Sequence, residues 1–408
     1  ASSAAGRLFG EIPFRGALLV GVADLEPPAR LTLLVQIADG SGDPLLETPD
    51  LAFHYLEGDA WRPGVEADVD DKTDNLATSG VLGLAVPEAA DLDHSVLPAG
   101  LRWFRISAAE NVDALNRILA VSAQAATVVF KDQGNDPAFL EAARPPGTIA
   151  KLETPNPAIK KIAQPFASFG GRGREDLASF RRRASERLRH KDRASTMWDY
   201  ERLVLEAFPA LYRVKCLNHT ELVREGGRIV ADDEMRPGGV VVVTVPHTHD
   251  KPHLDPLRPY ADQATLRAVH KVLAARMSPF VRLEVQNPKF EEAHVKFDVA
   301  FNEDIADIAF YEAELQRELI DYLTPWRNPP KGQARDIAFG GRLWKSAIIN
   351  FIEERSYVRY LENVELYHKP DPTLPDSEWS RVDQEAIEAS TARSILVSAR
   401  VHEINQAS

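Results

Sequence analysis

A proline-rich break between residues 144 and 165 divides this chain of 408 residues. Five prolines fall in that stretch, and its apolar residues follow neither a helical nor a strand period. Because proline lacks a backbone donor and restricts the residue before it, the stretch predicts an extended connector. We therefore expect a Pro-rich linker over residues 144–168 with separate domains on either side. The length of the chain also predicts two to four domains.

Short apolar runs separated by turn residues precede the break. The run LTLLVQI at residues 31–37 is typical of a buried strand, and a cluster of Gly, Asp and Pro follows it. Further strands are expected at residues 51–56, 81–86, 101–107 and 125–130, with one helix near residues 112–120. Strands at this spacing predict a mainly antiparallel, β-sandwich-like domain over residues 1–143.

A basic stretch at residues 169–219 follows the break. Between residues 172 and 193, nine Arg and Lys stand against four Asp and Glu, although the whole chain has a formal net charge of −13. Four apolar residues in its first half have helical spacing: Leu177, Phe180, Ala184 and Leu188. We therefore expect a helix with one buried face and an arginine-rich face opposite, and a charge contrast of this kind indicates a partner.

The second half of the basic stretch predicts another helix. Thr196 and Asp199 form a capping-box pattern, and Pro209 ends the helical period. One apolar stripe runs along this helix: Met197, Tyr200, Val204 and Phe208. We expect the two helices to pair antiparallel, as a helical joint over residues 169–212.

The remaining sequence alternates strand and helix patterns. Strands at residues 213–218, 240–245 and 281–286, a loop at 224–239 and a helix at 262–277 predict a first small α+β unit over residues 213–290. A second unit over residues 291–369 has strands at 294–302 and 364–367 and helices at 310–323 and 342–355. The predicted fold class is thus multidomain α+β, with two ferredoxin-like units after the joint. Residues 370–408 are expected to form an extension that docks elsewhere or frays.

Composition excludes several classes of protein. A sequence pI near 5.4 disfavours general affinity for nucleic acid. A single cysteine, Cys216, cannot form an intrachain disulfide and indicates folding in a reducing compartment. The sequence has no secretory signal pattern and no apolar run near 18 residues, so this chain is not expected to insert into a membrane. The absence of an initial Met suggests a portion of a longer polypeptide.

One loop could hold a metal ion. His247, His249 and His253, with Asp250 between them, could supply a zinc set with an open position, as in a metal-dependent hydrolase. No second His/Asp cluster follows, and nearby prolines favour a plain surface loop. We therefore expect no metal site here and keep the hydrolase as an alternative.

Other motifs that resemble functional sites are incomplete. The acidic run at residues 68–74 lacks the Gly and Glu of a calcium loop, and the glycines at 170, 171 and 173 are not followed by Gly-Lys-Ser/Thr. On one strand, the side chains of Cys216 and His219 would point in different directions or lie too far apart to form a catalytic dyad. The sequence therefore predicts no catalytic residue and no cofactor.

The arginine cluster has two non-catalytic interpretations. It is either a solvated helix face with weak internal pairs or a docking surface. In the second case its guanidinium groups meet carboxylates of a partner chain or of the other, acidic domains of this chain. Three arginines in series spread over more than half of a helix, so at least one must point toward the apolar side; this favours docking. Nucleic-acid binding is disfavoured because aromatic residues are not interleaved with the basic ones. The candidate intersubunit contacts are Arg174, Arg181, Arg182, Arg183, Arg187, Arg189, Trp198, Asp199, Tyr200 and Glu201.

Three strings in this region resemble the baseplate J-like family, the wedge proteins of contractile phage tails and of extracellular contractile injection systems. They are QPFASFGG at residues 164–171, SERLRHKDRA at 185–194 and WDYERLVLE at 198–206, and KCLNH at 215–219 also fits. The strings are closer to the large wedge component of antifeeding-prophage-like systems than to a phage protein. Residues 33–46, together with the region of Trp61, Trp103 and Phe104, resemble the β-rich domain of that group.

The resemblance implies a structural role without cofactor or active site. Such wedge proteins pair through a helical bundle and link into a six-fold ring around the spike hub, which holds the sheath until the target is touched. The implied partners are a second baseplate J-like chain, the spike hub and sheath-proximal components. Assembly in the bacterial cytoplasm into a releasable particle is also implied. A carbohydrate-binding tail protein, with Trp61 and Trp103 exposed on one face of the sandwich, is the other alternative.

Overall fold

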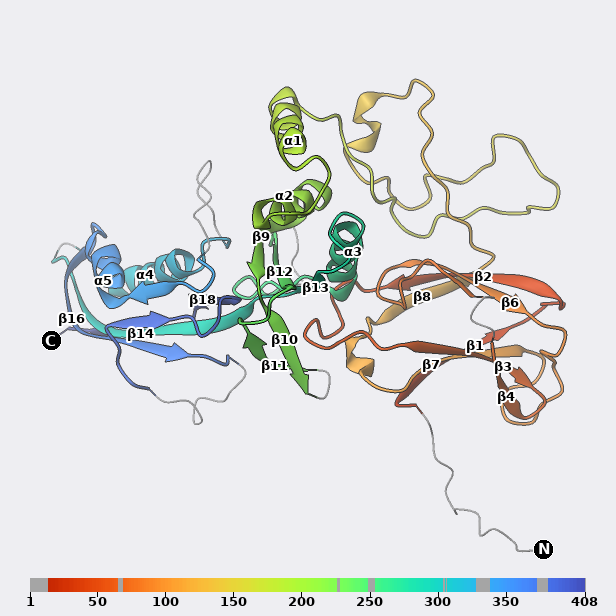
Figure 1. Cartoon of the computed structure of the whole chain (residues 1–408), viewed down its shortest axis with the longest axis horizontal. Helices are drawn as coiled ribbons and strands as arrows, with labels where there is room; N and C mark the ends of the chain where they lie inside the picture. Colours follow the sequence, from red (N-terminus) through yellow and green to blue (C-terminus); the bar gives the residue numbers. More distant parts are fainter. Residues whose placement is uncertain are drawn as a thin grey trace, which may run out of the picture. The chain divides into compact units, whose positions relative to one another are not determined.

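The computed structural model describes residues 14–64, 69–225, 228–248, 254–303, 305, 307–327, 338–372 and 381–407. These residues form mainly β-sheet, with five α-helices among them, so the mixed α and β composition predicted from the sequence is confirmed. The chain divides into two compact units, residues 1–126 with 193–408 and residues 127–192. Figure 1 colours these segments along the sequence.

The N-terminal part forms two antiparallel sheets that share one core. One sheet has the order β1-β7-β3-β4 and the other β5-β6-β2-β8. Side chains from both sheets, such as Leu33, Leu82 and Phe104, pack in the same buried cluster, so the sheets form a sandwich. The strands are β1 (Gly16–Val22), β2 (Ala29–Ile37), β3 (Leu51–Glu57), β4 (Ala60–Pro63), β5 (Val69–Asp71), β6 (Gly80–Val86), β7 (Arg102–Ala108) and β8 (Ile118–Ala123).

The end of the sandwich differs from the sequence prediction. Instead of a helix near residues 112–120, only the short 3-10 turn η2 (Val112–Ala114) is helical. β8 follows it and pairs antiparallel with β2, which supplies the backbone hydrogen bonds that a helix would have made locally. No strand forms at residues 125–130, because the positive φ of Gln124 ends the extended backbone there.

The first α+β layer contains a sheet with the order β13-β12-β9. β12 (Gly239–Pro246) pairs parallel with β13 (Arg282–Gln286) and antiparallel with β9 (Leu211–Asn218). The helices α2 (Met197–Ala207) and α3 (Gln263–Ala274) pack on it, and Val204, Val242 and Val269 lie in their common core. The expected loop at residues 224–239 instead contains most of a hairpin of β10 (Glu221–Glu225) and β11 (Arg228–Asp233).

The second α+β layer is organised around β14 (Lys289–Phe301). β16 (Val358–Lys369) pairs antiparallel with it, and β18 (Ser394–Ser398) and β19 (Glu403–Gln406) pair parallel with it. The helices α4 (Ile308–Leu323) and α5 (Lys345–Glu353) lie on the same side of this sheet (Figure 1) and bury Leu319 and Ile352 against it.

Two features of this layer depart from the expected ferredoxin-like units. The order of helices and strands in either layer is not β-α-β-β-α-β. Residues 370–408, expected to be an extension, supply β18 and β19 to the central sheet as well as β17 (Ala386–Glu388). β17 pairs with β15 (Arg342–Trp344), so the helix expected from residue 342 begins only at Lys345.

Candidate intersubunit surface

The helix α1 (Leu177–His190) carries most of the predicted contact residues. Its N-cap is Asp176, whose carboxylate accepts hydrogen bonds from the Ser179 amide (2.9 Å) and hydroxyl (2.8 Å). These hydrogen bonds lower the pKa of Asp176. At the other end, the backbone of Lys191 is in the left-handed conformation that often ends a helix. Basic residues fill the last turn, where positive charge interacts favourably with the helix dipole. The helix is therefore well capped by its own sequence.

The face of α1 that the sequence predicted to be buried is exposed. Leu177, Phe180 and Leu188 have exposed fractions of 62%, 49% and 77%. The least exposed residues are instead Ser179, Arg183, Glu186 and His190, with Ala184 at the border of the apolar stripe. Residues three or four apart lie on one side of a helix, so the less exposed side of α1 is polar and its apolar side is exposed. The prediction of one buried apolar face was wrong for the isolated chain.

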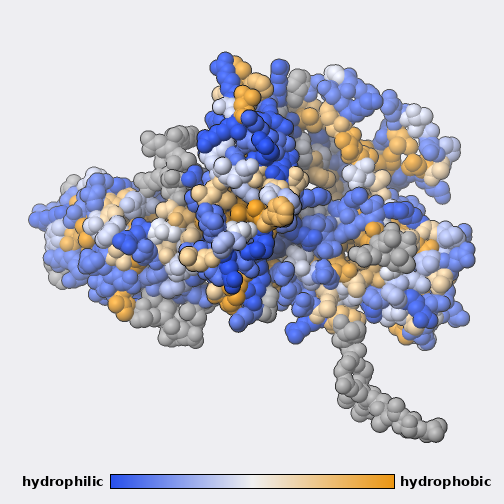
Figure 2. All heavy atoms as spheres, in the orientation of Figure 1, coloured by the Kyte–Doolittle hydropathy of each residue, from blue (hydrophilic) through white to orange (hydrophobic). Residues whose placement is uncertain are grey.

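The whole unit at residues 127–192 shares this exposure. Among its described side chains only His190 is buried, so these residues form no apolar core of their own. Figure 2 shows hydrophobic residues exposed among hydrophilic ones on the visible face of the molecule. The exposed large apolar residues of the unit at residues 127–192 are Val128, Val129, Phe130, Ile149, Leu152, Ile159, Phe169, Leu177, Phe180 and Leu188.

The unit also separates charge from the rest of the chain. It contains thirteen Lys and Arg and eight Asp and Glu, a net of +5, so the remaining residues carry −18 of the total of −13. A unit that is basic, apolar at its surface and attached to a strongly acidic remainder suits contact with an acidic partner.

The arginines of α1 differ in how they are held. Arg183 forms a fork-like pair with Glu175, with Nε 3.0 Å from Oε1 and Nη2 2.8 Å from Oε2, and this pairing lowers the pKa of Glu175. Its guanidinium also lies 5.4 Å from the ring centroid of Phe180, so it turns toward the apolar side as the sequence required. Arg187 reaches Asp192 only at 3.9 Å. Arg174, Arg181, Arg182 and Arg189 are exposed.

The predicted contacts on α2 are used mainly within the chain. Asp199 is buried and closes the capping box, accepting from the Thr196 amide at 2.8 Å. Tyr200 is also buried, and burial raises its pKa. Glu201 accepts a hydrogen bond from the Cys216 amide of β9 at 3.1 Å. Trp198 is half-buried, 5.8 Å from the Arg202 guanidinium. These contacts hold α2 on the sheet.

The predicted helical joint is divided between the two compact units. α1 belongs to residues 127–192 and α2 to the other unit, with the boundary after Asp192. The antiparallel pairing of the two helices therefore stays a prediction.

The candidate chemistry of the sequence finds little support in the described residues. Within them, no group of three or more His, Cys, Asp or Glu side chains could hold a metal ion. His247 packs edge-on against Tyr212, with ring centroids 5.3 Å apart, whereas His249 and His253 lie outside the described residues. Burial raises the pKa of the Cys216 thiol to about 12, which makes it a poor nucleophile.

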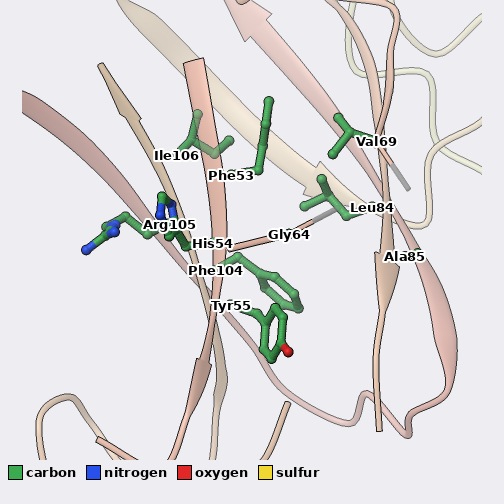
Figure 3. Close-up of a pocket in the computed structure, with 10 residues that line it drawn as sticks. All are labelled: Phe53, His54, Tyr55, Gly64, Val69, Leu84, Ala85, Phe104, Arg105 and Ile106. Carbon is green, nitrogen blue, oxygen red and sulfur yellow. The ribbon is translucent and has the colours of Figure 1, made fainter. Parts of the chain in front are cut away.

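The sandwich contains a small hollow of about 20 Å³ lined by Phe53, Leu84 and Phe104, with His54 and Arg105 also on its wall (Figure 3). A volume of this size holds about one water molecule, which is too little for a sugar or a cofactor.

The two tryptophans proposed for carbohydrate binding are engaged with protein groups. The Trp103 indole lies against Gly21, where an added Cβ would come within 2.9 Å of the ring, and its Nε1 donates to the Pro98 carbonyl at 3.1 Å. The Trp61 ring lies 4.8 Å from the Arg105 guanidinium. Both residues are half-buried, so neither ring is a free stacking platform.

A larger groove of about 300 Å³ lies between the loop at residues 45–50, α3 and β13. Its walls are tied together by Gln263, which donates to the carbonyls of Pro44 (2.9 Å) and Leu46 (2.7 Å), and by Arg267, which pairs with Asp74 at 3.0 Å. These polar contacts join the sandwich to the α+β layer, and the groove is the seam between them.

None of the helices that the structure describes is both long and apolar enough to cross a membrane.

A capped helix with its apolar side outward, on a basic unit with no buried apolar side chain among those described, is typical of a surface that binds other proteins. The family model described as baseplate protein PVC11-like matches residues 14–386, and the chain belongs to this family. This confirms the predicted baseplate protein of a contractile injection system.

Among solved structures, the chain is similar to one in the cryo-EM structure of the anti-feeding prophage baseplate, six-fold symmetrised. The identity is 15%, the match covers 95% of this chain and 77% of that chain, and the TM-score is 0.42. A TM-score this low establishes no common fold. No curated protein matches the sequence.

Proposed function

We propose that this baseplate protein is a non-enzymatic wedge subunit. It links neighbouring subunits into a six-fold ring around the spike hub and couples target contact to contraction of the sheath. Its partners are a second wedge chain of the baseplate J-like type, the hub and sheath-proximal components. The observation that carries the proposal is the exposed apolar surface of residues 127–192, which have no buried apolar side chain of their own among those described.

The chemistry of this surface suits a ring that must hold and then rearrange. Arg181 and Arg182 are exposed and make no hydrogen bond or ion pair within the described part of the chain. Guanidinium groups that meet carboxylates across a subunit boundary give modest, directional contacts that can break and re-form when subunits rotate. A single large apolar interface would resist such a step.

The single thiol of the chain is compatible with assembly in the bacterial cytoplasm before release as part of a particle. Cys216 is the only cysteine and is buried. Its raised pKa keeps it protonated, so that a later change to an oxidising environment has little to act on.

Charge reversal tests the proposal. We expect Arg182→Glu, Arg183→Glu and Arg187→Glu together to give particles with incomplete baseplates, scored by electron microscopy. The matched control reverses three arginines with side-chain exposures of 55–60% outside residues 127–192: Arg30, Arg62 and Arg317. Complete baseplates in the first variant would refute the docking role, and equal loss in the control would indicate a general charge effect.

A further inference from the structure

The apolar side chains of α1 form one narrow stripe on the outside of the helix. At 100° per residue, Leu177, Phe180, Ala184 and Leu188 fall within an arc of about 80°. The three large side chains are between 49% and 77% exposed. A stripe of this width is that of a helix that inserts between two ridges of another protein rather than one that lies under a broad sheet.

Arginines border the stripe on both sides. In the same projection Arg181 lies about 20° beyond Leu188 on one side, and Arg187 about 20° beyond Phe180 on the other. Arg182 and Arg189 lie about 160° and about 140° from the centre of the stripe, on another part of the surface. Arg183 is already held by Glu175 at 2.8 Å. The arginines that border the stripe and are not closely paired are therefore Arg181 and Arg187, whose guanidinium lies 3.9 Å from Asp192.

We infer that α1 docks by this stripe into a groove of another baseplate chain, a groove with an apolar floor and carboxylates along both rims. The inference rests on the proposed function and adds the chemistry of the partner surface. Apolar burial would supply the affinity, and two rows of arginine–carboxylate contacts would set the register of the helix in the groove. The net charge of +5 on residues 127–192 favours the same acidic partner at longer range.

Two other kinds of partner fit these observations less well. Nucleic acid would meet an apolar centre instead of cations, and the other residues of the chain carry −18. An anionic membrane would meet only three large apolar residues in a helix of 14, with Glu175 and Asp176 at its start.

The experiment compares three paired variants of the full chain for incorporation into particles. We expect the stripe variant Leu177→Ser/Leu188→Ser and the rim variant Arg181→Glu/Arg187→Glu each to lose about tenfold or more in incorporation. The matched control Arg30→Glu/Arg62→Glu carries the same charge change outside residues 127–192 and should stay within about twofold. All six positions are exposed, so circular dichroism and the melting temperature of the free chains should be unchanged.

A photo-crosslinker in place of Leu188 then identifies the partner surface in the particle. We expect crosslinks to apolar residues next to Asp or Glu on another chain, and two of those carboxylates changed to Lys should restore incorporation of the rim variant. Crosslinks within the same chain, or stripe-dependent binding of the free protein to phosphatidylserine vesicles or to DNA, would overturn the inference. Loss in the control pair but not in the rim pair would refute the inference and leave the wedge role standing. Complete baseplates in particles without this chain would refute the wedge role itself.

Discussion

Acid should loosen the sheet around β14 in two steps that belong to two different side chains. Glu291, on β14, has a fully buried side chain. It accepts hydrogen bonds from His368 at 2.8 Å and from the Ser390 amide and hydroxyl, and Lys289 lies 3.3 Å away. Burial alone would raise the pKa of Glu291, but the hydrogen bonds from His368, Ser390 and Ser394 and the charge of Lys289 outweigh it and bring the pKa to about 2.

The second side chain is His402, between β18 and β19. It is buried, its Nδ1 accepts from the Val295 amide of β14 at 3.2 Å, and its Nε2 lies 2.9 Å from the Ser398 hydroxyl. Burial, with a smaller contribution from His294, lowers the pKa of His402 to about 3. The neutral imidazole therefore helps to hold β18 and β19 on the sheet.

The sign and size of each effect follow from proton linkage. Glu291 has a folded pKa below the ordinary 4.5, so its stabilisation is full above pH 4.5 and is lost as the pH falls toward 2. At about 1.4 kcal/mol for each tenfold change in proton affinity, the loss is about 3 kcal/mol. His402 protonates in the unfolded chain near pH 6.5 but in the folded chain only near 3, so stability falls over that range by up to about 5 kcal/mol.

The assay is hydrogen exchange of the amides of β18 and β19 from pH 7 to pH 3, corrected for the intrinsic exchange rate. In the unmodified chain the free energy of opening should decrease from pH 6.5 downward and more steeply below pH 4.5. His402→Gln should remove the slope between pH 6.5 and 4.5, and Glu291→Gln should reduce only the slope below 4.5. If each variant keeps the slope that its side chain is said to cause, the buried network does not control this sheet.

Three further outcomes are expected. Arg393→Met should lower the free energy of urea unfolding by about 3–5 kcal/mol, because it leaves the nearly fully buried Asp232, paired at 2.8 Å, without its partner. Adding Asp232→Asn should recover part of the loss, and no recovery would refute the pairing. Leu188→Ser should change the free energy of unfolding by less than about 0.5 kcal/mol, whereas Leu319→Ala, at a fully buried site, should lower it by about 2–5 kcal/mol. Similar costs for the two variants would contradict the exposure of the stripe. Dialysis against EDTA should leave the melting temperature unchanged, and a loss with restoration by zinc would revive the hydrolase alternative at the loop of His247.

The local pattern of apolar and polar residues predicted most of the central strands and helices, because the residues that pack in the core recur with the period of a strand or a helix. The run at residues 31–37 is β2, and the helix expected at residues 262–277 is α3, capped by Asp262. The β10–β11 hairpin was missed although Gly226 and Gly227 separate two short apolar runs, which is a hairpin signal. β18 and β19 could not be predicted in the same way, because they are held by pairing with β14, about a hundred residues earlier in the chain.

The helix α1 shows the limit of such prediction for the candidate site itself. Its apolar period is local and predicted the helix correctly. Which side of a helix faces inward is decided by the surface it packs against, and for α1 the polar side is the less exposed one. An apolar stripe left outside costs the free chain little, because its large side chains are already exposed in the unfolded state and keep 49–77% of that exposure. When another chain covers the stripe, as proposed, the burial gained should drive assembly without adding to the stability of the free subunit.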